Sequence, residues 1–364
     1  MLLNGLKEEK EGLANKKIFS DKFVNKPNKL ISMIEIILAI VLVIVGIILL
    51  TKGSDWMTDS LIPVAERLGT TYIAVASILV SIMLSIPEIF VAIYAFLRGY
   101  VGISLGVIIG SIICNIGLMT GLSAMIKPLS VDGRVVIRDG VFAFIISIIV
   151  FLFGYDLNYD RIEGFTLLLL FVPYVVNVWF FEKWTTKKAR KEELKEIKEE
   201  LQVIGFRGIE LKPSLFLFLI GSALLLFGSY LFSESLIKIA KLTGISDVLI
   251  GLTVGAIGPS IPNIVAAVHG TVKNYTKIAI TETFGSDIFT LLITLGLLAV
   301  LAPFSIDERW LNFDIPIMLF MTFMMMFFIF KGHIKKEKAI LRHEGASLVI
   351  FYILFLILNF IYFS

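Results

Sequence analysis

Ten apolar stretches, each long enough to cross a lipid bilayer, dominate this sequence of 364 residues. They lie at about 32–51, 70–97, 101–126, 135–154, 162–182, 214–232, 246–269, 276–302, 313–330 and 345–363. A transmembrane helix needs about 20 consecutive, mostly apolar residues. Because lipid offers no hydrogen-bond partners, each crossing segment must bond its own backbone as a helix. The sequence therefore predicts an all-α polytopic membrane protein with ten transmembrane helices.

The composition excludes most soluble classes of protein. Hydrophobic residues make up 57% and charged residues 17% of the chain, whereas soluble domains are about 45–50% apolar and about 25% charged. A net charge of +3 is too small to indicate a nucleic-acid partner. The single cysteine, Cys114, excludes an intramolecular disulfide, and three scattered histidines argue against a zinc enzyme.

Charged residues divide the chain into four parts. A polar tail at 1–31 precedes a first half at 32–182, a charged linker at 183–212 and a second half at 213–364. The tail does not resemble a signal peptide, because no small-residue cleavage site follows it. The linker mixes both charge signs at helical spacing, so we expect a solvated cytoplasmic helix.

The distribution of Lys and Arg predicts the orientation in the membrane. With the N-terminus outside, the inner loops hold 21 of these residues and the outer segments 12. Inner loops are enriched in Lys and Arg, so we expect an outside N-terminus. We expect a multi-pass protein of a prokaryotic cell membrane.

An internal repeat relates the two halves. When the sequence is shifted by 175 residues it aligns with itself without a gap, and 24 of the 80 positions from 53 to 132 are identical. Ser85-Ile86-Pro87 aligns with Ser260-Ile261-Pro262, and Gly110-Ser111 with Gly285-Ser286. With five spans in each half, the second copy enters the membrane in the opposite direction. We therefore predict two inverted five-helix repeats, an arrangement that places transporter sites near the middle of the membrane.

Each repeat carries a proline inside an apolar span, Pro87 in the first and Pro262 in the second. Proline donates no backbone hydrogen bond and clashes with the preceding turn, so we expect each helix to break or kink. The carbonyls of Met83 and Gly258 lose their partners, and Pro259 frees a further carbonyl at Gly255. Such carbonyls are tolerated at membrane depth where they line a cavity or meet an ion.

A carboxylate stands directly beside the first proline. Glu88 lies deep in its apolar span, and no Lys or Arg lies in the central part of any span. A buried carboxylate is costly unless it is paired, coordinated or protonated. A bound cation or a proton is the partner that this position predicts.

The third and eighth spans carry the second set of polar residues. Ser111 and Asn115 share a helix face, and Ser286 and Thr290 repeat that spacing. Asp287 lies three residues before Thr290, and Glu282 lies one turn before Ser286. Hydroxyl, amide and carboxylate oxygens are hard ligands that suit Ca²⁺ or Na⁺ better than softer metals.

These motifs resemble the cation/calcium antiporter superfamily, and the sodium/calcium exchanger group in particular. The resemblance rests on Ser-Ile-Pro-Glu at 85–88 with Gly-Ser-Ile-Ile-Cys-Asn at 110–115, and on Gly-Pro-Ser-Ile-Pro-Asn at 258–263 with Gly-Ser-Asp-Ile-Phe-Thr at 285–290. It implies alternating access, with Na⁺ or H⁺ driving Ca²⁺ transport through ligands on four spans. The metal-binding residues that we predict are Ser85, Glu88, Ser111, Asn115, Ser260, Asn263, Glu282, Ser286, Asp287 and Thr290.

Several positions depart from the pattern of that family. Leu84 and Pro259 stand where the family has threonine ligands, and Asn263 stands where it has a second acid. Thr290 replaces the usual Asn or Asp. Conversely, Asp287 and Glu282 both occupy positions that are usually Asn. We expect that the negative charge has been relocated to the eighth span.

The predicted function is secondary exchange of Ca²⁺ for Na⁺ or H⁺. The alternatives are the same fold carrying another divalent cation or only monovalent cations, or a sensor or scaffold that transports nothing. No catalytic cluster or P-loop is visible, so we predict neither an enzyme nor an ATP-driven pump. The expected partners are inorganic cations and the bilayer, with no tightly bound cofactor and no nucleic acid. The coupling ion, its stoichiometry and the oligomeric state stay open, and we expect protons to contribute to coupling.

Overall fold

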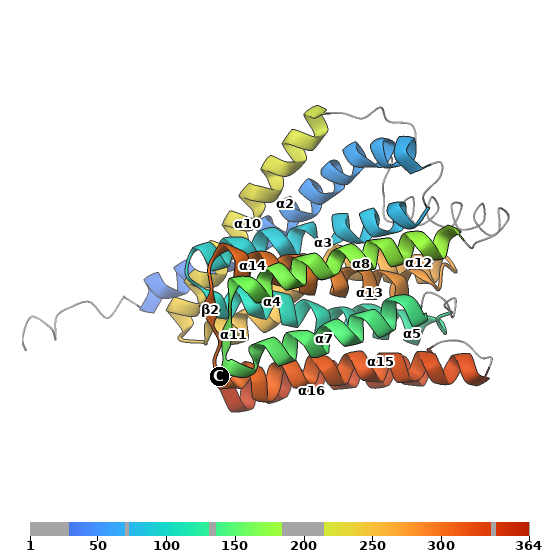
Figure 1. Cartoon of the computed structure of the whole chain (residues 1–364). Helices are drawn as coiled ribbons and strands as arrows, with labels where there is room; N and C mark the ends of the chain where they lie inside the picture. The colour runs from blue at the N-terminus through green and yellow to red at the C-terminus, as the bar shows by residue number, and fades with distance from the viewer. Residues whose placement is uncertain (1–28, 70–72, 131–135, 184–214, 336–339, 364) are drawn as a thin grey trace, which may run out of the picture.

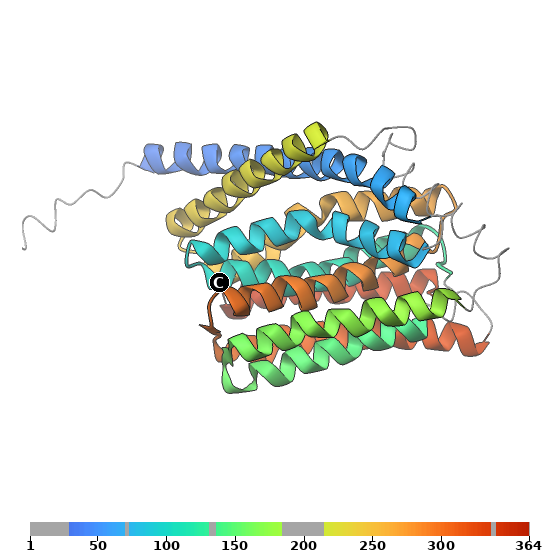
Figure 2. The same ribbon diagram turned by 45° about the horizontal axis from the view of Figure 1, so that its top comes forward.

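The computed structural model describes residues 29–69, 73–130, 136–183, 215–335 and 340–363, and they are almost entirely helical. Figures 1 and 2 show the helices side by side in one bundle, with the pair α2 and α10 outermost in both views. The prediction of an all-α polytopic membrane protein is confirmed. The predicted tail at 1–31 and linker at 183–212 lie almost wholly outside the described residues.

The elements follow a similar order in the two halves, where η marks a π-helical turn except for the 3₁₀ turn η3. The first half contains α2 (Lys29–Gly69), α3 (Ile73–Leu97), α4 (Val101–Cys114), η1 (Asn115–Thr120), α5 (Gly121–Ile126), η2 (Val136–Gly140), α7 (Val141–Phe153), η3 (Gly154–Asp156), β1 (Asn158–Tyr159) and α8 (Arg161–Lys183). The second contains α10 (Leu215–Thr243), α11 (Asp247–Ile250), η5 (Gly251–Gly255), α12 (Ala256–Val272), α13 (Ile278–Phe289), η6 (Thr290–Leu295), α14 (Gly296–Leu301), β2 (Phe304–Ser305), η7 (Trp310–Asp314), α15 (Ile315–Lys335) and α16 (Arg342–Phe363).

Within the described residues, nine helices are long and apolar enough to cross a membrane, and a shorter apolar stretch covers Ser85–Leu97 of α3. Two helices continue well beyond the predicted spans. α2 reaches Gly69 although its apolar run ends near residue 51, and α10 reaches Thr243 instead of residue 232. Hydropathy reports the part of a helix that lies in lipid, and a polar sequence of good helical propensity extends the helix into the surroundings.

Neither repeat proline divides its helix into separate segments. α3 runs through Pro87, and α12 runs through Pro259 and Pro262, so the prediction of a broken helix is wrong. The irregular backbone lies just before α12, in η5, which ends at Gly255. Pro259 cannot donate a hydrogen bond to Gly255, and a π-turn redistributes the bonds over one extra residue.

Glycines bring the two halves into close contact. A Cβ atom on Gly53 of α2 would lie 2.9 Å from the carbonyl oxygen of Gly221 in α10, and one on Gly228 would lie 3.2 Å from the carbonyl oxygen of Gly46. The members of the first contact correspond to those of the second through the 175-residue shift. Each half therefore supplies the same two positions to a pair of reciprocal contacts.

The same reciprocity recurs farther along the chain. A Cβ atom on Gly345 of α16 would lie 2.7 Å from the carbonyl oxygen of Gly121 in α5, and one on Gly296 of α14 would lie 3.0 Å from that of Gly164 in α8. Short β-bridges accompany these helices: Leu129 pairs with Ile340, and β1 pairs antiparallel with β2. The turn segments of each half are therefore hydrogen-bonded to the other half.

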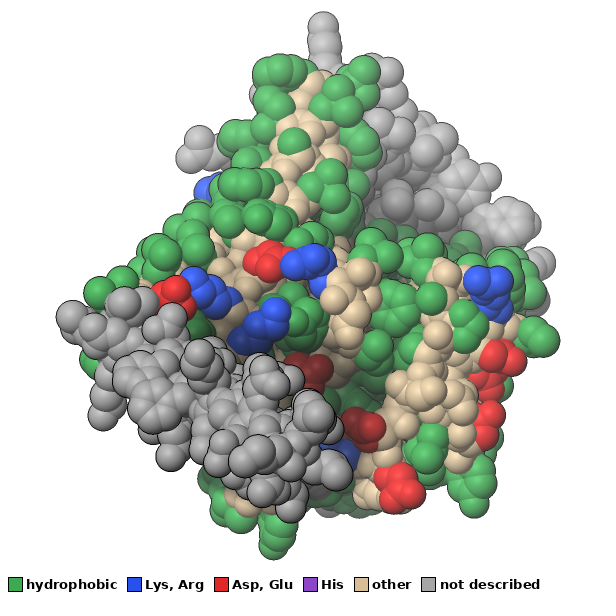
Figure 3. Space-filling model, turned by 90° about the vertical axis from the view of Figure 1, so that its left-hand side faces the viewer, with side chains coloured by type: hydrophobic (Ala, Val, Ile, Leu, Met, Phe, Trp, Pro, Cys, Tyr) green, Lys and Arg blue, Asp and Glu red, His purple; other side chains and the backbone are tan. Residues whose placement is uncertain are grey.

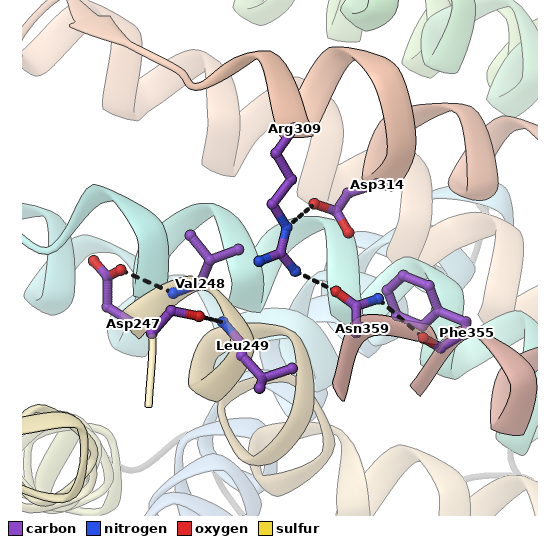
Figure 4. Close-up of polar contacts among 8 residues, drawn as sticks. Asp247, Val248, Leu249, Arg309, Asp314, Phe355 and Asn359 are labelled. Atoms are coloured by element: carbon purple, nitrogen blue, oxygen red, sulfur yellow. Dashed lines mark hydrogen bonds and ion pairs between the residues drawn. The ribbon is translucent and has the colours of Figure 1, made fainter. Parts of the chain in front are cut away.

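Polar contacts close the bundle at the end where α3 and α10 finish. Figure 3 shows charged side chains around a hollow at this end. In Figure 4, Arg309 donates to Asp314 (3.0 Å) and also to Asn359, which ties the start of η7 to the end of α16. Ser246 caps α11 by accepting from the Leu249 amide at 3.3 Å. These contacts satisfy polar groups where the helices leave the apolar layer.

Candidate cation site

Glu88 lies at the centre of the bundle, where α3 faces α12. Its side chain is only 1% exposed. The Ser260 hydroxyl donates to Glu88 Oε1 at 3.1 Å, and the Asn263 amide donates to the same oxygen at 3.3 Å. The other carboxylate oxygen, Oε2, is buried and has no hydrogen-bond partner within the described part of the chain. One face of the carboxylate is thus held in place while the second oxygen remains available to a ligand.

Asn263 is the repeat counterpart of Glu88, because the two positions differ by 175 residues. A direct hydrogen bond between counterparts means that their side chains meet where the two repeats face each other. The repeated Ser-Ile-Pro motif therefore delivers one acid and one amide to the same point. An amide can donate to the acid through its nitrogen and leave its oxygen to coordinate a cation.

A second polar group joins α3, the start of η1 and α13. Ser85 donates to the Ser286 hydroxyl at 2.9 Å, and Asn115 donates to that hydroxyl at 3.3 Å. The Asn115 amide also reaches Asp287 Oδ1 at 3.3 Å. These contacts bring four of the sequence-predicted residues together, although Asn115 and Asp287 are 172 positions apart.

Four oxygen atoms in this region are buried and have no hydrogen-bond partner among the described residues. They are Glu88 Oε2, Ser111 Oγ, Asn115 Oδ1 and Asn263 Oδ1. Buried polar atoms in native proteins nearly always have a partner, and such exceptions need an explanation. All four are hard oxygen donors, so Na⁺ and Ca²⁺ fit the donor set and thiophilic metals do not.

The carboxylate of Asp287 extends the group on the α13 side. Asp287 is 3% exposed and accepts from the Asn115 amide. Cys114 lies within electrostatic reach of both Asp287 and Glu88. Within the described ranges, no cluster of three or more His, Cys, Asp or Glu side chains is placed to hold a metal. The candidate site therefore combines two carboxylates with neutral oxygen donors.

Two predicted residues lie less centrally. Thr290 is buried and begins η6, but no hydrogen bond joins it to the other predicted residues in the described structure. Glu282 is buried on α13, five residues before Asp287, and the two carboxylates interact electrostatically. Glu282 also acts on Tyr174, which faces Asp139. Asp139 in turn forms an ion pair with Arg138 at 2.7 Å.

Sequence reasoning missed a row of hydroxyls next to the site. Thr120 and Thr283 are hydrogen-bonded at 2.7 Å, and the Thr283 hydroxyl approaches the Asn115 carbonyl oxygen at 3.5 Å. Asn115 begins the π-helical turn η1, so its backbone lies where α-helical bonding is interrupted. The only available signal was a polar residue in each apolar span, which does not identify the partner.

A second missed group lies between the site and the end shown in Figure 3. The Tyr94 hydroxyl donates to Glu234 at 2.9 Å, and Arg98 donates to the same oxygen at 2.5 Å. These bonds join α10 to the last turns of α3. Tyr94 lies six residues beyond Glu88, which is about 9 Å along the helix axis. The contact therefore separates the central residues from this end of the bundle.

Comparison with known proteins gives consistent results over nearly the whole chain. The family model described as "Sodium/calcium exchanger protein" matches residues 38–180 and 213–361. Sodium/calcium exchanger MaX1 of Methanosarcina acetivorans is 29% identical over 346 residues, which cover 88% of this chain and 97% of that protein. Inner membrane protein YrbG of Escherichia coli is 29% identical over 288 residues, which cover 79% of this chain and 87% of that protein.

A solved structure shows the same fold. The structure of the sodium-calcium exchanger NCX_Mj soaked with 2.5 mM Na⁺ and 0.1 mM Ca²⁺ superposes with a TM-score of 0.59 at 27% sequence identity. The match covers 90% of this chain and 99% of that chain. Both halves of the family model and the solved structure therefore match the regions that contain α3, α4, α12 and α13.

Proposed function

The chain belongs to the sodium/calcium exchanger protein family, and from that premise we propose that it exchanges Ca²⁺ for Na⁺ or H⁺ by alternating access. It is a multi-pass membrane cation antiporter and not an enzyme. The observation that carries the choice of cation is the set of four buried, unpartnered oxygens beside Glu88 and Asp287. Hard cations with flexible coordination are the ligands that such a set favours.

We further propose that the halves 32–182 and 213–364 are inverted repeats of five helices each. The reciprocal contacts Gly53–Gly221 and Gly46–Gly228 support this relation, because a two-fold axis between the halves generates them in pairs. So does the hydrogen bond between the counterparts Glu88 and Asn263. Inverted repeats allow one central site to face either side of the membrane through related movements of the two halves. The Lys and Arg distribution favours an N-terminus outside a prokaryotic plasma membrane.

The proposed ligands fall into two groups. Glu88 and Asp287 supply negative charge, and hydroxyl and amide oxygens complete the coordination. The uncharged ligands are Ser85, Ser111, Asn115, Ser260, Asn263, Ser286 and Thr290. Glu282, which lies farther along α13, is proposed to influence the cation electrostatically.

The alternatives differ in the ion and not in the architecture. Another divalent cation, or monovalent cations alone, would use the same oxygens. The loss of threonine at Leu84 and Pro259 and of an acid at Asn263 reduces the ligands available to several Na⁺ ions at once. This composition favours protons as at least part of the counter-ion, since a proton needs a single carboxylate.

Glu88→Gln tests the proposed site, because it keeps the shape of the side chain and removes its charge. We expect loss of Ca²⁺ flux in vesicles under an imposed Na⁺ or pH gradient, with unchanged insertion into the membrane. Glu308→Gln is the matched control, since Glu308 is exposed at the end of the bundle. Flux at the parental rate in Glu88→Gln would rule out Glu88 as a ligand, and equal losses in both variants would point to a general defect.

A further inference from the structure

The described site contains two carboxylates and no compensating positive side chain. Glu88 and Asp287 are 1% and 3% exposed. Their printed hydrogen-bond partners are the neutral side chains of Ser260, Asn263 and Asn115. None of the ion pairs found among the described residues involves either acid. The side chains at the centre of the bundle therefore carry a charge of minus two when both acids are ionised.

The repeat adds no further charge at the equivalent positions. Asn263 is the counterpart of Glu88 and donates an amide hydrogen bond to it. Thr290 is the counterpart of Asn115, and Ile112 is the counterpart of Asp287. Each half thus contributes one acid from a different helix, Glu88 from α3 and Asp287 from α13. The two charges come from two non-equivalent places, and neither repeat supplies both.

Glu282 is the remaining buried acid on these helices. It lies on α13 toward Tyr174 and the ion pair of Arg138 with Asp139. Glu282 also has an interaction of its own beyond those described above. Its side chain has no described hydrogen bond to Ser85, Glu88, Asn115 or Ser286, which form the centre of the site. We therefore leave its charge out of the central count and use it as a control.

Charge balance in a buried site limits which cations can be bound together. In a low-dielectric interior, an uncompensated charge is strongly disfavoured. Cations of total charge two neutralise Glu88 and Asp287, whereas a third monovalent cation leaves an uncompensated positive charge. We propose that exchange through this site is electroneutral, with one divalent cation exchanged for two monovalent cations. A proton on either acid counts as one of the two.

This inference rests on the proposed function, and the experiment separates the two. Purified full-length protein is reconstituted into vesicles, and Ca²⁺ uptake is driven by a Na⁺ gradient or by a pH gradient. The membrane potential is set independently with K⁺ gradients and valinomycin. Movement of one net charge per cycle would change the equilibrium Ca²⁺ ratio by roughly 50-fold for a potential of about 100 mV. Electroneutral exchange gives the same ratio at every potential.

The outcomes are distinct. A Ca²⁺ ratio that is independent of potential and equals the square of the monovalent-ion gradient supports the inference. Uptake that follows the potential overturns it while leaving Ca²⁺ exchange intact. Absence of Ca²⁺ uptake under either gradient contradicts the proposed function itself.

Two variants test which acids set the charge. Asp287→Asn leaves one carboxylate, so we expect any remaining Ca²⁺ transport to follow the potential. Glu282→Gln is the matched control and should remain independent of potential. The reverse result, with only Glu282→Gln becoming potential-dependent, would overturn the assignment of the second charge to Asp287. Because the parent protein alone decides whether exchange is electroneutral, a variant that fails to fold does not remove the test.

Discussion

At the scale of single residues, the site joins side chains whose neighbours in sequence are almost all apolar. Glu88 and Asn263 each follow a Ser-Ile-Pro segment, and their side chains are hydrogen-bonded to each other. Motif spacing was sufficient to identify both positions, because a polar residue that recurs beside a proline in an apolar span is difficult to explain by packing. The identity of the partner depends on how two helices 175 residues apart face each other.

Asp287 illustrates what the residues alone did not determine. The sequence indicated an acid near Ser286 and Thr290, but it did not indicate that the Asn115 amide holds its carboxylate. The contact depends on the packing of α13 against η1, and η1 is a π-helical turn with no local sequence signal in an apolar run. Thr290, assigned by the same spacing, has no described hydrogen bond to the group.

We predict that Asp287→Asn weakens Ca²⁺ binding more than Glu282→Gln does. Asp287 contacts Asn115 in the central group, whereas Glu282 lies toward Tyr174. Loss of a carboxylate ligand should cost at least about tenfold in affinity, which corresponds to about 1.4 kcal/mol. A Ca²⁺-binding titration of the purified variants measures both effects. Equal or reversed effects would assign the second charge to Glu282.

At the scale of whole helices, the existence of each element followed from hydropathy, but helix ends and irregular turns did not. The five π-helical turns occur at related places: η1 and η6 begin at Asn115 and Thr290, and η2 and η7 precede α7 and α15. The first pair differs by the repeat shift of 175 residues. Such turns depend on tertiary packing, because the same apolar residues form regular α-helix on either side.

The close contact of α2 with α10 makes a steric prediction. A Cβ atom on Gly221 would lie 2.6 Å from the backbone nitrogen of Met57 and 2.9 Å from the carbonyl oxygen of Gly53. Gly221→Val should therefore force the helices apart and destabilise the fold by about 1–3 kcal/mol. Thermal unfolding in detergent measures the loss. Leu219→Val is the control, since Leu219 is largely exposed on the same helix; the same loss in both variants would contradict the packing argument.

At the scale of the whole molecule, the repeat predicted more of the architecture than any single motif. The two matched regions, 38–180 and 213–361, carry elements in nearly the same order. What the repeat did not predict is that contacts between the halves are reciprocal, as in the β-bridge of Leu129 with Ile340 and the pairing of Tyr159 with Phe304. These depend on how the halves are placed against each other.

The whole transport cycle makes a prediction about the coupling ion. Ca²⁺ uptake is measured in vesicles at a fixed, symmetric Na⁺ concentration while the pH gradient is reversed. We expect the uptake to change with the direction of the pH gradient, because the site has few ligands for several Na⁺ ions and two acids that can each bind a proton. Unchanged uptake would exclude proton coupling and leave Na⁺ as the driving ion.

The contact between α16 and the first half has a consequence for biosynthesis. A Cβ atom on Gly117, within η1, would lie 2.5 Å from Tyr352 Cβ, so the last helix packs directly on the turn that begins at Asn115. Gly345 packs in the same way on Gly121. A nascent chain that has inserted all but its final span therefore leaves this turn uncovered. Release of the C-terminal residues from the ribosome, and not completion of the first half, is the step at which the ion pathway becomes sealed from the surrounding lipid.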